Sequence, residues 1–191
     1  MAEKKNLAVF ASGTGTNFDA IARACRDGVL PARVAIMVCD KPGAPVVEKA
    51  AAYGVKTFVA SPKDFPSKAD FEREVVRRLK EEDIDLVCLA GYMRILTDVV
   101  LDAYPGRIIN IHPSLLPSFR GAHAVEQAVA FGVKVYGITI HYVNSELDGG
   151  KSIAQRAFEY DGTDPEEVHR LGQPVEHALY VETIAKLLKQ L

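Results

Sequence analysis

The sequence predicts an α/β protein with a Rossmann-like, doubly wound, mostly parallel sheet, helices on both faces and an antiparallel edge in the C-terminal part. Short apolar runs alternate with amphipathic helical segments over residues 6–111, which is typical of a parallel sheet. A glycine-rich turn joins the first run to the first helical segment. After residue 131 two strand-like runs follow each other without a helix between them, which favours antiparallel pairing at the sheet edge.

The pattern predicts the elements in a definite order. Apolar and β-branched runs predict strands over residues 6–11, 34–38, 56–59, 86–90, 107–111, 136–142 and 153–158. The first helix follows residue 17, where apolar side chains recur at helical spacing in Phe18, Ile21, Ala22 and Cys25. Further helices are expected over residues 45–52, 68–82, 97–103 and 122–131. The helix over 68–82 carries its apolar side at Phe71, Val75, Val76 and Leu79.

The last helical region has a well-formed start. Asp164 suits the N-cap, Pro165 the first helical position, and Glu167 a capping box. Pro174 predicts a break or kink, because proline lacks the backbone N–H that a helix interior requires. The closing helix is expected to pack through Val181, Ile184, Ala185 and Leu188.

Length and composition limit the classes of function. A chain of 191 residues with 48% hydrophobic and 25% charged residues suits a single globular domain over 1–191. The net charge of −2 and the absence of a long basic run argue against nucleic acid as a partner. No run has membrane-spanning length and no signal segment is visible, so we expect a cytoplasmic protein without a membrane partner. The three separated cysteines, without CxxC spacing, predict buried free thiols.

The glycine-rich turn Ser12-Gly13-Thr14-Gly15-Thr16-Asn17 is a candidate phosphate site. Glycines allow close backbone approach to an anion, and the N-terminus of the following helix supplies free N–H groups. Phe18 stands where a dinucleotide fingerprint has its third glycine, and no Gly-Lys-Ser/Thr follows. A small phosphorylated metabolite therefore fits better than NAD or ATP. The alternative is a purely structural strand-to-helix turn.

A second candidate site combines two distant stretches. Asn110 and His112 emerge two residues apart at the end of a predicted strand, so their side chains share one face. Asp148 lies beside the Gly149-Gly150 turn. Together they would supply an oxyanion donor, a proton donor and a carboxylate that orients the imidazole. The structural alternative is a capping Asn, a hydrogen-bonded core His and a turn Asp.

The remaining histidines are expected to be structural or solvated. His123, His169 and His177 fall on or near predicted helices, and His141 lies on a strand with apolar neighbours. His141 and Asp148 lack a visible third ligand at suitable spacing, so no metal is expected.

Four ordered motifs carry a resemblance along nearly the whole chain. SGTGTN (residues 12–17), LAGYMRIL (89–96), NIHPSLLP (110–117) and ELDGG (146–150) resemble the phosphoribosylglycinamide formyltransferase family of purine synthesis. The resemblance implies transfer of a formyl group from the co-substrate 10-formyltetrahydrofolate to the amine of glycinamide ribonucleotide, without a metal. It leaves open a monomer or a homodimer.

The resemblance also implies site residues. The catalytic residues would be Asn110, His112 and Asp148. The ribonucleotide would bind Gly15, Thr16, Asn17, Gln173 and Glu176. The folate would bind Lys68, Met93, Arg94, Ile95, Leu96, Asn110, Asn144, Ser145, Glu146, Leu147 and Asp148.

The chemistry of these residues agrees with direct attack of the amine on the formyl carbon. Asn110 and His112 would donate to the oxyanion of the tetrahedral intermediate, and Asp148 would favour the charged imidazole. Related enzymes that hydrolyse formyltetrahydrofolate or formylate methionyl-tRNA remain alternatives, although we expect this chain to lack their additional domains. Arg120-Gly121, where many members have Pro-Gly, is a feature shared with the tRNA enzymes. A non-catalytic Rossmann-like module that binds a phosphorylated ligand is the alternative outside enzymes.

Overall fold

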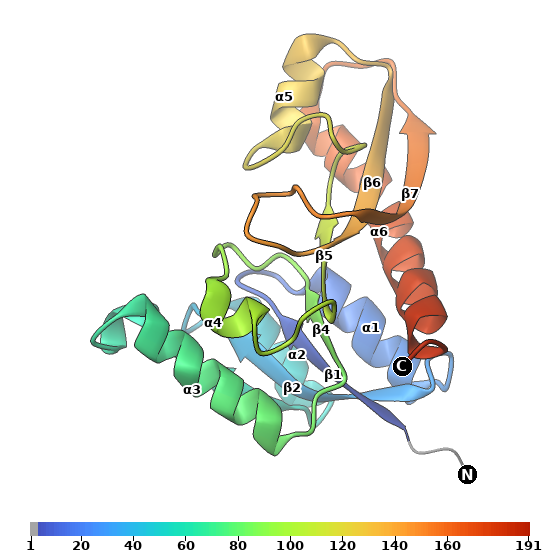
Figure 1. Ribbon diagram of the computed structural model, residues 1–191. Helices are drawn as coiled ribbons and strands as arrows, with labels where there is room; N and C mark the ends of the chain where they lie inside the picture. Colours follow the sequence, from blue (N-terminus) through green and yellow to red (C-terminus); the bar gives the residue numbers. More distant parts are fainter. Residues whose placement is uncertain (1–3) are drawn as a thin grey trace.

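The computed structural model describes residues 4–191, and its centre is one seven-stranded sheet in the order β3-β2-β1-β4-β5-β6-β7 (Figure 1). The strands are β1 Lys5–Phe10, β2 Ala32–Cys39, β3 Lys56–Val59, β4 Leu86–Leu89, β5 Ile108–His112, β6 Val135–Tyr142 and β7 Ser152–Glu159. The helices are α1 Thr16–Arg26, α2 Pro45–Ala52, α3 Lys68–Glu81, α4 Asp98–Leu101, α5 Ala124–Phe131 and α6 Pro165–Leu188, with a 3₁₀ turn, η1, at Pro62–Asp64.

The sheet has a parallel part and an antiparallel edge, as predicted. Strands β1 to β5 pair in parallel, whereas β6 runs antiparallel to both β5 and β7. The order reverses direction at β1, which lies between β2 and β4, so the carboxyl ends of β1, β4 and β5 lie next to one another. In open α/β sheets this edge is where ligands bind. The sheet therefore brings the glycine-rich turn and the Asn110–His112 stretch to the same edge.

Helices cover both faces of the sheet, and β1 shows the two-sided burial directly. Leu7 and Val9 pack in a core cluster with α1 and α6, while Ala8 and Phe10 pack in a second cluster with α3 and α4. Tyr180 on α6 is fully buried, and its hydroxyl group faces the carbonyl oxygens of Leu89 and Ile109 at 2.8 and 3.3 Å. This contact fixes α6 against β4 and β5.

The predicted elements are present, with ends that differ by no more than two residues. Phe18, Ile21, Ala22 and Cys25 are all buried on α1, and the three cysteines are free and buried. Helix α4 is shorter than predicted and β5 extends to His112. Between residues 4 and 191 no helix has the length and apolar character that a membrane span requires.

Helix α6 differs from the prediction in two respects: the helix does not break and the capping box is absent. The helix does not break at Pro174 but runs through it from Pro165 to Leu188, because it is packed on the core on both sides of the proline, at Val168 and Leu179. Asp164 does cap the helix by accepting from the N–H of Glu166, yet the capping box does not form. The N–H of Asp164 donates to the Tyr160 hydroxyl instead, and Glu167 pairs with Arg170.

The connection between β6 and β7 approaches the backbone of β6 very closely. A Cβ atom at Gly150 would lie 1.7 Å from the carbonyl oxygen of Tyr142, whereas one at Gly149 would meet only the side chain of Glu146. The Tyr142 N–H also donates to the carbonyl oxygen of Lys151. Only glycine at position 150 therefore lets the loop that carries Asp148 fold back on β6.

We predict that Gly150→Ala lowers the free energy of unfolding by several kcal/mol, because backbone atoms cannot move away from the new methyl group as a side chain can. Gly149→Ala is the matched control and should cost about 1 kcal/mol or less, since the Glu146 side chain can rotate away. Urea denaturation of the two variants and the parent protein measures the difference. Equal losses for both variants would contradict the backbone approach at Gly150.

Candidate active site

The end of β5 places Asn110 and His112 on one face of the sheet. In the antiparallel pairing with β6, Asn110 lies opposite His141 and His112 lies opposite Thr139. The Asn110 Nδ2 atom is 3.2 Å from His141 Nε2. Cross-strand neighbours on the same face are in contact, so the strand pairing brings a second histidine beside the predicted pair.

Asp148 lies between the two histidines. Its Oδ2 atom is 3.4 Å from His112 Nδ1 and its Oδ1 atom is 3.6 Å from His141 Nε2. The N–H of Gly121 donates to Oδ2 at 2.7 Å. Asp148 has a left-handed backbone with φ of 48°, a conformation that Asp and Asn tolerate better than most residues. Asn110, His112 and Asp148 are thus brought together, with His141 as a fourth member for which a structural or solvated role was expected.

The hydrogen-bond partners define the protonation states that fit each ring. His112 Nε2 lies 2.8 Å from the carbonyl oxygen of Phe119, so this nitrogen carries a hydrogen. Its Nδ1 faces Asp148, and an imidazolium would satisfy both acceptors. His141 Nδ1 lies 2.9 Å from the carbonyl oxygen of Tyr142 and carries a hydrogen too. A neutral His141 accepts from the Asn110 amide through Nε2, and a charged one donates to Asp148.

The carboxylate of Asp148 is stabilised in its charged form. The contact with His141, then the Gly121 N–H and the nearby imidazoles, lower the pKa of Asp148 against the opposing effect of burial. A group with a lowered pKa stays ionised through the neutral range. Asp148 is therefore a fixed negative charge beside the two rings.

The loop after β5 is held by buried polar contacts. The Thr139 hydroxyl donates to the carbonyl oxygen of Ser114 at 2.7 Å and accepts from the N–H of Leu116 at 3.1 Å. Ser114 in turn donates to the carbonyl oxygen of Ser118 at 2.6 Å. These bonds fix the course of the chain up to Phe119, whose φ of 52° aims its carbonyl oxygen at His112.

The glycine-rich turn ends at the N-terminus of α1. Gly15 is the N-cap with φ of 71°, and a Cβ atom there would lie 2.4 Å from a methyl group of Val46. No side chain caps this helix, so the N–H groups at Thr16 and Asn17 can face a ligand. Gly15 is therefore required by packing as well as by conformation.

The turn is joined to α6 by one buried hydrogen bond. Asn17 Nδ2 donates to Glu176 Oε2 at 2.9 Å, while Asn17 Oδ1 is buried without a partner among residues 4–191. Burial raises the pKa of Glu176, and the bond from Asn17 only partly opposes this. The structure thus brings Glu176 to the turn, whereas Gln173 is exposed and its side chain forms no hydrogen bond within the described part of the chain.

The predicted folate residues fall on two loops at the same edge. In the segment after β4, Met93 and Ile95 are 80% and 58% exposed and Leu96 is buried. Arg94 pairs with Asp40, and Lys68 at the start of α3 donates to the carbonyl oxygen of Ile95. In the β6–β7 loop, Asn144 accepts from the N–H of Glu146, Ser145 and Leu147 are exposed, and Glu146 pairs with Arg120.

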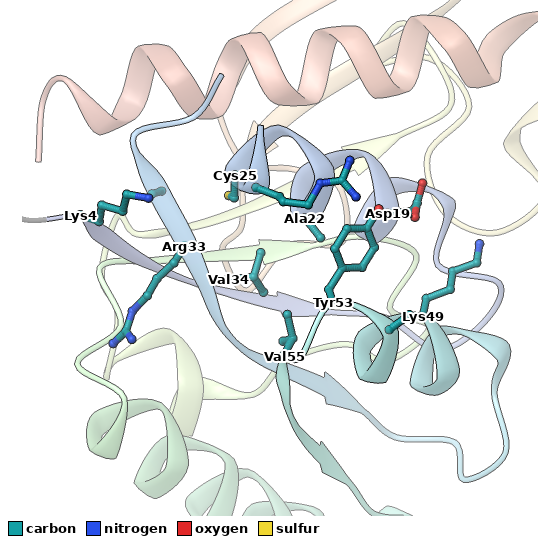
Figure 2. Close-up of a pocket in the computed structure, with 12 residues that line it drawn as sticks. Lys4, Asp19, Ala22, Cys25, Arg33, Val34, Lys49, Tyr53 and Val55 are labelled. Carbon is teal, nitrogen blue, oxygen red and sulfur yellow. Dashed lines mark hydrogen bonds between the residues drawn. The ribbon is translucent and has the colours of Figure 1, made fainter. Parts of the chain in front are cut away.

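A large surface cavity lies elsewhere. A cavity of about 630 Å³ lies over α1, β2 and α2. Figure 2 shows side chains that line it, among them Lys4, Asp19, Cys25, Arg33, Lys49 and Tyr53. None of the predicted site residues lines it.

Across residues 4–191, no cluster of three or more His, Cys, Asp or Glu side chains has the geometry to hold a metal ion.

Comparisons with known proteins show similarity along nearly the whole chain. The family model described as formyl transferase matches residues 5–184. Phosphoribosylglycinamide formyltransferase of Bacillus subtilis is 46% identical over 96% of this chain and 95% of its own length. The trifunctional purine biosynthetic protein adenosine-3 of Drosophila melanogaster is 36% identical over 97% of this chain, which spans 14% of that longer protein.

A solved structure gives the same relationship in three dimensions. The crystal structure of glycinamide ribonucleotide transformylase 1 from Geobacillus kaustophilus superimposes with a TM-score of 0.94 and 52% identity, over 97% of this chain and 100% of that one. The family match, the identity along nearly the whole chain and the shared fold all point to one assignment. The chain belongs to the formyl transferase family.

Proposed function

We propose that this protein transfers the formyl group of 10-formyltetrahydrofolate to the amine of glycinamide ribonucleotide in purine synthesis. The observation that carries the proposal is the meeting of Asn110, His112 and Asp148 at the sheet edge that also holds the uncapped start of α1. The similarity to phosphoribosylglycinamide formyltransferase over nearly the full length of both chains supports the choice of substrates.

The two substrates would occupy different loops. The N–H groups at the start of α1 suit the ribonucleotide phosphate, and Glu176, held by Asn17, suits the ribose hydroxyls. The exposed apolar side chains of Met93, Ile95 and Leu147 suit the flat ring system of the folate. The formyl carbon would then lie between the loops, near Asn110.

Formyl transfer needs no enzyme nucleophile. The amine nitrogen attacks the formyl carbon and a C–N bond forms, which gives a tetrahedral intermediate; the bond to the folate nitrogen breaks as this intermediate collapses. Asn110 uses one amide hydrogen on His141 and has a second hydrogen for the oxyanion. The proton lost by the amine must reach the folate nitrogen, and a charged His112 beside Asp148 can stabilise or relay it. To reach the oxyanion, His112 would exchange its bond with Phe119 for one with substrate.

Incubation with both substrates tests the proposal. Tetrahydrofolate release, followed by absorbance, and a formylated ribonucleotide, detected by mass spectrometry, should require the ribonucleotide amine. Methionyl-tRNA should not act as an acceptor. Release of formate without any amine would indicate a hydrolase, and formylated tRNA would indicate the other relative.

We predict that Asp148→Asn folds normally but lowers kcat by about 10²-fold or more, the scale of a lost acid–base or oxyanion contribution. Asn tolerates the left-handed backbone at this position and can still accept from the Gly121 N–H, but it removes the charge beside both imidazoles. Steady-state kinetics with both substrates saturating measures the effect. Asp161→Asn, which removes an exposed carboxylate paired with Lys134, is the control and should leave kcat unchanged. A normal kcat in Asp148→Asn would remove Asp148 from the mechanism.

We predict that Glu176→Gln becomes progressively more stable relative to the parent protein as pH rises. The folded-state pKa of Glu176 is raised by burial, so the folded parent binds more protons than the unfolded chain and loses stability as pH rises through that pKa. Glutamine removes this loss and can still accept from Asn17. Urea denaturation from pH 4 to pH 8 measures the difference.

Glu182→Gln on the same helix is the matched control with the opposite sign. The Arg156 partner lowers the pKa of Glu182, so this carboxylate adds stability above its unfolded pKa. Its removal should lower relative stability as pH rises. If the stability of Glu176→Gln relative to the parent protein fell with pH, as expected for Glu182→Gln, Glu176 would not be a destabilised buried carboxylate beside the glycine-rich turn.

A further inference from the structure

Asp40 is a buried carboxylate at the carboxyl end of β2, outside the groups assigned above to binding or catalysis. Its side chain is 6% exposed, and both of its oxygens are used. Oδ1 accepts from the Ser12 hydroxyl at 2.5 Å, and Oδ2 accepts from Arg94 Nε at 2.7 Å. Ser12 opens the glycine-rich turn after β1, whereas Arg94 belongs to the loop after β4. One carboxylate therefore joins two loops that are about 80 residues apart in sequence.

Ser12 passes this contact on to the backbone of the second loop. The N–H of Met93 donates to the Ser12 hydroxyl oxygen at 2.9 Å. An ionised carboxylate can only accept, so the hydroxyl hydrogen must point to Asp40 and its lone pairs remain for Met93. The N–H of Ser12 also donates to the carbonyl oxygen of Gly91 at 3.1 Å. Asp40 thus fixes the direction of the hydroxyl group that holds Met93.

The other end of the same loop is held by a second buried carboxylate. Glu72 on α3 is 2% exposed and accepts from both the N–H and the hydroxyl of Thr97. Between these two anchors the side chains of Met93 and Ile95 remain largely exposed. A segment with fixed ends and exposed apolar side chains is a preorganised binding surface, because it loses little entropy when a ligand binds.

The segment that follows Asp40 makes a second contact with the glycine-rich turn. The N–H of Val46, at the start of α2, donates to the carbonyl oxygen of Gly13 at 3.1 Å. Asp40 and the first turn of α2 therefore contact the glycine-rich turn at Ser12 and Gly13, respectively. The Ser12 hydroxyl is occupied by Asp40 and Met93, so it is not available to a phosphate.

We propose that Asp40 is a positioning residue for the formyl donor, acting through Ser12 and Arg94 on the loop Met93–Leu96. It ties that loop to the turn that opens α1, so that the surfaces for the two substrates keep a fixed separation. The identity of the donor rests on the function proposed above. The positioning itself is a property of the protein alone and can be measured without any substrate.

Amide hydrogen exchange by NMR tests the positioning directly. In Asp40→Asn the Ser12 hydroxyl is no longer fixed by a carboxylate, and in Ser12→Ala the acceptor for Met93 is removed. The Met93 amide should exchange about 10-fold faster or more in both variants. Ser12→Ala keeps the Asp40–Arg94 pair, so it remains informative if Asp40→Asn fails to fold. Unchanged protection of Met93 in Ser12→Ala would overturn the proposal.

Asp85→Asn is the matched control. Asp85 is a partly buried carboxylate that accepts from a backbone N–H, that of Asn6, and from Lys5 Nζ, but it precedes β4 at the opposite end of the sheet. It should leave Met93 protection unchanged. Loss of Met93 protection in all three variants would mean a general loosening of the fold and would overturn the specific role of Asp40.

Calorimetry with tetrahydrofolate, in the presence of glycinamide ribonucleotide, tests the consequence for binding. Asp40→Asn and Ser12→Ala should each raise the Kd for tetrahydrofolate about 10-fold, and the double variant should be little worse than Asp40→Asn because both act through one contact. The KM for the formyl donor should rise while kcat at saturation stays near the parent value. Altered Met93 exchange with an unchanged Kd would overturn the role at the donor site. A parent protein that binds no tetrahydrofolate would instead refute the proposed function and leave the exchange result standing.

Discussion

The carboxylate of Asp148 is the group on which the arrangement of the candidate site depends. A buried charge is costly unless it is paired and hydrogen-bonded, and Asp148 meets this condition only because three segments reach it. His112 comes from β5, His141 from β6 and the Gly121 N–H from the loop between them. The antiparallel pairing of β5 and β6 sets His141 opposite Asn110, so the register of these two strands is a requirement of the site.

The parallel and antiparallel parts of the sheet contribute different chemistry. The parallel part ends in helix N-termini, whose free N–H groups suit an anion, as at the start of α1. The antiparallel part supplies cross-strand side-chain contacts and the tight β6–β7 loop, which suit proton transfer at a fixed geometry. Strand β4 lies between β1 and β5, and its following loop separates the two regions. A reaction that transfers a group from a large planar donor to a phosphorylated acceptor can use this order of strands, because it places the two binding regions side by side.

The sequence was sufficient for the fold because each segment has its own periodicity, and all seven strands lie where apolar runs predicted them. The sequence was less informative where contacts with residues distant in sequence determine the local structure. Helix α6 continues through Pro174 because it is packed on the core on both sides of the proline. The N–H of Asp164 donates to the Tyr160 hydroxyl and not to the Glu167 side chain. The position of His141 in the site was likewise not predicted, and a structural or solvated role was expected for it. Its role depends on lying opposite Asn110, and strand register is not visible in a single sequence.

Asp40 shows why polar burial is more informative in a structure than in a sequence. In the sequence it is a single acidic residue after a strand, a position where turn residues are common. In the structure it is one of several buried polar side chains that follow the strands at their carboxyl ends, together with Ser12, Asn17 and His112. Each of these groups costs free energy to desolvate and has a specific partner, although the Oδ1 atom of Asn17 has none within residues 4–191. A fold that needed only a packed core could place apolar residues there at lower cost, so their concentration at one edge indicates that the precise position of the loops is what they stabilise.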